Sequence, residues 1–131
     1  MKNFTKLLPI LSAKAATGIG TPQFIEDWKI VLLQFATASS ANMTVKFQIS
    51  YSDTCPDFSA AQSVSNHWDY VNVVDLQPGT AIAGDTGIAL SGTDDFRNLE
   101  LNTNGAKWLN AVVTAYAAGA VTVKMKGINN L

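Results

Sequence analysis

Charged side chains are scarce in this chain. Asp, Glu, Lys and Arg together make up 15% of its 131 residues, against about 25% in an average soluble protein. The net charge is −1, and the lysines are scattered singly along the sequence. Nucleic-acid binding depends on clustered Lys and Arg side chains that neutralise phosphates. The composition therefore predicts a protein that has no nucleic-acid partner.

Cysteine and histidine each occur once, as Cys55 and His67. A lone cysteine excludes an internal disulfide framework and a paired-cysteine metal site. His67 would need a nearby nucleophile and an orienting acid to act as a catalytic base, and no nucleophile motif such as Gly-X-Ser-X-Gly is present. We therefore interpret His67 as a surface residue and Cys55 as a small residue tolerated in a turn.

The acidic residues gather modestly in polar, turn-rich segments, where their side chains commonly cap the backbone. Their spacing matches no calcium-binding loop, although a site built from several loops is physically possible. The residues concerned are Asp53, Asp57, Asp85, Asp94 and Asp95. The sequence thus predicts no enzyme, with no catalytic residue, no cofactor and no metal site.

Long apolar runs are also missing. No stretch approaches the about 20 apolar residues of a membrane span, so we expect no membrane partner. Near the N-terminus Leu7–Leu11 supplies only five residues with Pro9 among them, which is short for a secretory leader of about 7–15 apolar residues. We therefore prefer an extended N-terminal arm, residues 1–17, followed by one domain, residues 18–131. The apolar arm residues are candidate assembly contacts: Phe4, Leu7, Leu8, Ile10 and Leu11.

What the chain does contain is alternation with a period of two. Over residues 42–52 large apolar side chains occupy every second position, and residues 120–126 repeat the pattern. This spacing places the apolar groups on one face and predicts two half-buried strands. Residues 67–76 and 107–118 are apolar on both faces, which indicates strands whose second face meets an arm, a loop or another subunit.

Two connections are predicted to be turns. Residues 36–41 are small and polar, and we expect them to form a loop between a strand over residues 28–37 and the strand that follows. A helix over residues 24–37 is the alternative, but the continuous apolar run at residues 30–33 argues against a surface helix. Gly119 is expected to close a tight hairpin between the last two strands.

Short strands separated by turn-rich segments are typical of all-β architectures. We therefore predict an all-β fold, specifically a two-sheet antiparallel β-sandwich of jelly-roll type. Aromatic side chains in strands more often fill a core than form a surface platform. We expect this of the three Trp and three Tyr residues, Trp28, Trp68, Trp108, Tyr51, Tyr70 and Tyr116.

Several segments resemble small all-β virion proteins encoded by tailed phages and prophages. The resemblance covers about residues 17–129 and is carried by VKFQ, PDFS, WDYVNVVDL, GTDD and LNAVVTAYAAGAVTVKMK. It implies a structural part of a phage particle, assembled in the cytoplasm of the bacterial host.

Two roles follow from this resemblance. The first is a capsid-associated decoration or minor capsid protein that forms homo-oligomers and contacts the major capsid protein or tail proteins. The alternative is a tail-fibre or tail-tip module that recognises a glycan on the host surface.

Overall fold

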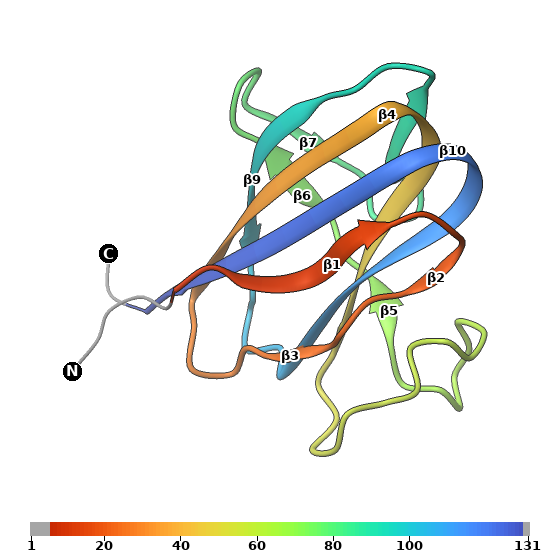
Figure 1. Cartoon of the computed structure of the whole chain (residues 1–131). Helices are drawn as coiled ribbons and strands as arrows, with labels where there is room; N and C mark the ends of the chain where they lie inside the picture. Colours follow the sequence, from red (N-terminus) through yellow and green to blue (C-terminus); the bar gives the residue numbers. More distant parts are fainter. Residues whose placement is uncertain (1–5, 130–131) are drawn as a thin grey trace.

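The computed structural model describes residues 6–129, which contain ten strands and no helix (Figure 1). An all-β, antiparallel fold was predicted and is confirmed. No helix in the described part of the chain is long and apolar enough to cross a membrane. The strands are β1 (Leu8–Lys14), β2 (Gly18–Ile19), β3 (Gln23–Phe24), β4 (Ile30–Ser50), β5 (Asp69–Tyr70), β6 (Val73–Asp75), β7 (Thr80–Ile82), β8 (Ile88–Ser91), β9 (Phe96–Asn102) and β10 (Trp108–Ile128).

Two 21-residue strands, β4 and β10, organise the fold. They pair antiparallel from Ile30 opposite Ile128 to Ser50 opposite Trp108. One half of the pair carries β1 on one side and β9, β6 and β7 on the other, in the order β1-β10-β4-β9-β6-β7. The other half carries β2 and β3 beside β10, and β5 and β8 beside β4.

All ten strands thus belong to one hydrogen-bonded sheet, where we expected two separate sheets. The reason is that β4 and β10 continue through the segments that we interpreted as turns. The loop predicted at residues 36–41 and the hairpin predicted at Gly119 were both wrong, because the chain does not reverse at either place. Figure 1 shows both strands curving together at this point instead.

Small residues and unusual backbone angles produce this bend. Ser39 and Ser40 have φ of 64° and 55°, and Gly119 has φ of 87°. The pairing of β4 with β10 is irregular between Val113 and Ala120. The carboxylate of Asp94 accepts hydrogen bonds from the backbone N–H groups of Ser40 and Ala41, at 3.2 and 3.1 Å. Backbone groups freed by the irregular pairing therefore find a partner, as buried or half-buried groups must.

A single apolar core fills the concave side of the bent sheet. Buried residues alternate along both halves of β4, and most of their partners on β9 and β10 are buried too. This is the predicted period of two, which is confirmed over residues 120–126 and 42–47, whereas Tyr51, expected on the same face, lies beyond β4 and is 59% exposed. The largest contributors with almost no exposed surface include Phe35, Leu33, Leu99, Leu101, Leu109 and Met125.

Within the segment predicted as an arm, residues 8–14 form a strand of this sheet. Strand β1 pairs with β10, and Ile10 and Leu11 are 3% and 1% exposed within the core. The carbonyl of Ile10 accepts a hydrogen bond of 2.8 Å from the Thr21 N–H. Ile10 and Leu11 are therefore core residues and not assembly contacts. Pairing of β1 with the edge of β10 buries these two apolar side chains. Leu7 and Leu8 are exposed, and Phe4 lies outside the described residues.

The strand 107–118, apolar on both faces, packs its second face against the chain's own loop. This loop, residues 51–68, follows β4 and places Phe58 and Trp68 over the sheet. Beneath it the Asn110 side-chain amide donates to Gln48 Oε1 at 2.7 Å, and the Gln48 amide donates to the Phe58 carbonyl at 3.0 Å. Of the arm, loop or neighbouring subunit that we expected to cover this face, the loop does so.

Candidate assembly surface

The lone histidine and cysteine both lie on the surface. His67 is exposed, as predicted, and has a φ of 59°; its carbonyl accepts a hydrogen bond of 2.6 Å from Ser50 Oγ. The exposed thiol of Cys55 donates to the Pro56 carbonyl at 3.5 Å. Partial burial raises the pKa of this thiol, which keeps it protonated and poorly nucleophilic. Through its backbone carbonyl, His67 therefore connects the end of the loop 51–68 to the last residue of β4.

The acidic residues serve turns and ion pairs. Asp53 bonds Lys107, whose ammonium group lowers the pKa of the Asp53 carboxyl, first through the hydrogen bond and then through its charge. Asp57 accepts hydrogen bonds from the hydroxyl and N–H of Ser59, which lower its pKa. Among residues 6–129 no group of three or more His, Cys, Asp or Glu side chains is placed to hold a metal ion.

The Asp53–Lys107 pair gives stability a mild dependence on pH. A carboxyl whose pKa is lowered on folding stabilises the fold above its ordinary value of 3.8, and this contribution disappears as the pH falls through the lowered pKa. We expect Asp53→Asn to lower the melting temperature by no more than about 4 °C at pH 6, because exposed ion pairs contribute little. The difference between the two proteins should shrink as the pH falls below 3.8, because protonation of Asp53 removes the ion pair. A deficit that stays constant as the solution is acidified, measured by circular dichroism, would contradict this assignment.

The aromatic side chains mostly fill the interior. Trp68 is 6% exposed, with ring centroids 6.2 Å from Phe58 and 5.0 Å from Tyr70. Trp108 is half-buried, and its indole N–H donates to the Ser52 carbonyl at 3.1 Å. The prediction that the Trp residues pack inside is confirmed for Trp68. Tyr51 differs, being 59% exposed beside a hollow of about 390 Å³ that His67 also lines.

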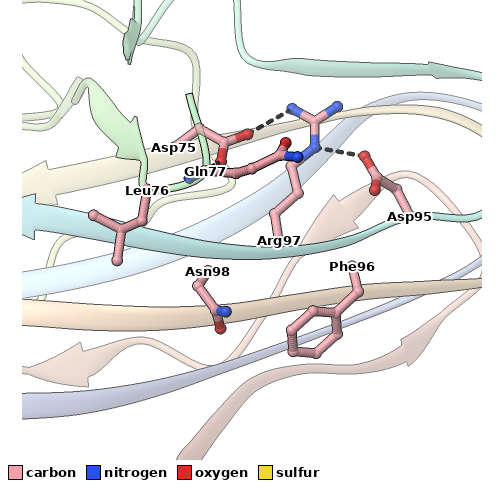
Figure 2. A pocket seen from close by; sticks show the side chains of 7 residues that line it. All are labelled: Asp75, Leu76, Gln77, Asp95, Phe96, Arg97 and Asn98. Carbon is pink, nitrogen blue, oxygen red and sulfur yellow. Dashed lines mark hydrogen bonds and ion pairs between the residues drawn. The ribbon is translucent and has the colours of Figure 1, made fainter. Parts of the chain in front are cut away.

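A larger hollow, of about 640 Å³, lies where β6 ends beside β9 (Figure 2). Its charged centre is Arg97, whose Nε lies 2.6 Å from Asp95 Oδ2 and whose Nη1 lies 3.7 Å from Asp75 Oδ2. Two carboxylates surround one guanidinium, so the net charge is negative and an anionic ligand would be repelled. The ion pair of Arg97 with Asp75 therefore connects β9 to β6.

The opposite side of β9 presents a different surface. In Figure 2, Arg97 points to one side of the strand, and Phe96 and Asn98 point to the other. That other side continues across β4 and β10 as a shallow groove of about 320 Å³. We call this surface the outer face. Its residues are Leu7, Leu32, Gln34, Leu76, Phe96, Asn98, Glu100, Lys124 and Lys126.

The outer face is apolar at its centre and ends. Leu7, Leu76 and Phe96 are 42%, 46% and 57% exposed, and the half-buried Leu32 lies between them on β4. Exposed apolar side chains gathered around one groove make this surface a candidate for contact with another molecule. Of the predicted arm contacts that the structure describes, Leu7 lies here. The sequence signal for the rest was the apolar run at residues 30–33, which makes β4 apolar on both faces.

Comparison with known proteins identifies a similar fold but no family. No family model matches the chain, and no curated protein matches its sequence. Among solved structures it is similar to the SPBc2 prophage-derived protein YomS, with a TM-score of 0.69 and 11% sequence identity. The similarity covers 95% of this chain and 92% of that one, so the two share their fold from end to end.

Proposed function

We propose that this chain is a structural protein of a phage particle, specifically a decoration or minor capsid protein that acts through protein–protein contacts. The observation that carries the proposal is the outer face, a sheet surface with exposed Leu7, Leu76 and Phe96 at its margins. Such a surface suits contact with another protein subunit of the particle, a second copy of this chain included. The fold shared with a prophage-derived protein supports a phage origin.

The proposal also assigns a mode of action. Strands β4 and β10 pair along both halves of the bent sheet, so each half is held to the other by two continuous strands. Side chains that sit on strands are held more precisely than side chains on loops. A rigid face of this kind binds a partner with little ordering cost, as a stoichiometric particle component requires.

Mass spectrometry of particles purified from the strain that encodes the chain tests this role. We expect the chain in mature particles at a fixed ratio to the major capsid protein. A second preparation from a strain with Leu32→Asp in the gene should contain at least about tenfold less of the chain, because a buried unpaired carboxylate opposes docking. Absence of the chain from native particles would refute the proposal.

A tail module that recognises a host glycan is the second candidate. The exposed ring of Tyr51 at the rim of the His67 hollow is the feature that favours it, since aromatic rings stack on sugars. Particle subfractions separate the two candidates. Recovery of the chain with isolated tails, together with loss of host-cell adsorption in Tyr51→Ala particles, would favour the tail module.

A further inference from the structure

Residues of the outer face lie in rows that cross the strands. Lys126 on β10 is paired with Leu32 on β4, and Leu32 is paired with Glu100 on β9. One row further along, Lys124, Gln34 and Asn98 are aligned in the same way. The next row contains Thr122, Ala36 and Phe96. Each row therefore has a basic or small residue on β10, an uncharged residue on β4, and an acidic, amide or aromatic residue on β9.

We propose that the outer face binds the outer face of a second copy of this chain, related by a twofold axis that runs along β4. Such a rotation exchanges the two sides of β4 and keeps each row at its own level. Lys126 of one copy then meets Glu100 of the other, and the same contact is made twice. Lys124 meets the amide of Asn98, and the large ring of Phe96 meets the small side chain of Thr122.

The charge pattern excludes the other simple arrangement. A twofold axis across the strands would place β10 of one copy on β10 of the other, which brings Lys124 and Lys126 near their own counterparts. Like charges facing each other across an interface cost several kcal/mol. Isologous contacts require a patch complementary to itself. The outer face is complementary to itself when the axis runs along β4, and it is not when the axis runs across the strands.

The apolar residues fit the same axis. Leu32 lies on β4 and therefore meets its own counterpart at the axis. Leu7 borders the β10 side of the groove and Leu76 borders the β6 side, so the rotation brings Leu7 of one copy toward Leu76 of the other. Phe96 and Leu76, 57% and 46% exposed in the single chain, would both be covered.

The size of the face limits the strength of the contact. The face is four strands wide (β10, β4, β9 and β6). This is about 19 Å when each strand occupies about 4.8 Å, which is small among specific interfaces. We therefore expect a dimer that dissociates on dilution, with a dissociation constant in the micromolar range, about 1–100 µM. This inference names the partner of the same face on which the proposed function rests. It is tested on the isolated protein, whereas the virion role is tested on particles, so either can fail alone.

Sedimentation equilibrium of the purified chain from about 5 µM to about 500 µM is the first test. We expect a shift from monomer to dimer across this range. Glu100→Lys should weaken the dimer at least about tenfold, because each lysine at position 126 then faces a like charge. Lys126→Glu should do the same, and the double variant should recover to within about threefold of the native constant. Asp85→Lys, an equal charge change in an exposed turn, is the matched control and should have no effect.

Covalent capture gives a second, independent measurement. In a Cys55→Ser background, Gln34→Cys places one thiol of each copy beside the axis, and we expect a covalent dimer with a short bismaleimide cross-linker, because facing sheets lie about 10 Å apart, beyond the reach of a direct disulfide. Val64→Cys, at a loop position 97% exposed and not on the outer face, should remain monomeric at the same concentration. A native chain that stays monomeric at about 500 µM would overturn the proposal. A double charge variant as weak as the single ones would also overturn it.

Discussion

Gly119→Ala is expected to lower the free energy of unfolding by about 3 kcal/mol or more, because it combines a backbone clash with a strained backbone angle. Gly119 has a φ of 87° at the bend of β10. A Cβ atom at this position would lie 2.5 Å from Ala41 Cα and 2.8 Å from the Ala38 carbonyl oxygen. Both atoms are backbone atoms of β4, so the two strands would have to separate where they bend together.

Comparison with Gly105→Ala separates the cost of this close contact from the cost of backbone strain. Gly105 has a φ of 82°, but an added Cβ atom would meet no atom within 4 Å. Its cost should therefore be only that of a left-handed alanine, about 1–2 kcal/mol. Urea denaturation of the two variants measures the difference. Equal losses in both would show that the close approach of β4 to β10 does not constrain the bend.

This bend is also where sequence-based prediction failed. Small residues at positions 36–41 and 117–120 read as turns, and the chain continues through them as strand. A signal for continuity was present: the buried positions are odd-numbered on both sides, as in Phe35 and Met43 of β4 or Val113 and Val121 of β10. Two separate strands share this phase half of the time, so the phase alone does not distinguish one continuous strand from two strands joined by a turn.

The candidate surface was less accessible to prediction than the fold. Alternation is a local property, so each strand could be predicted from its own residues. The outer face depends on cross-strand register, which joins Leu32 to Glu100 and to Lys126. These three residues are far apart in the sequence, and nothing local states which of them are neighbours. The two-sided apolar character of residues 30–33 indicated a covered face but not its partners.

Leu11→Ala is expected to lower the free energy of unfolding by about 2–5 kcal/mol, the cost of removing a fully buried leucine side chain from a core. Leu11 is 1% exposed and belongs to the same apolar cluster as Phe35 and Val123. In a flexible arm that only docks on other subunits, the same substitution would leave the isolated domain as stable as before. Chemical denaturation of the monomer at low concentration distinguishes these outcomes.

Leu8→Ala is the matched control, since it removes the same atoms from the same strand. Leu8 is 37% exposed, so its loss should change the unfolding free energy by no more than about 1 kcal/mol. A large effect of Leu11→Ala with a small effect of Leu8→Ala would establish β1 as a structural strand. It would also change the meaning of an N-terminal deletion. Removing residues 1–16 takes Ile10 and Leu11 out of the core and uncovers the edge of β10, so poor incorporation of such a variant into particles would report unfolding before it reported a lost contact.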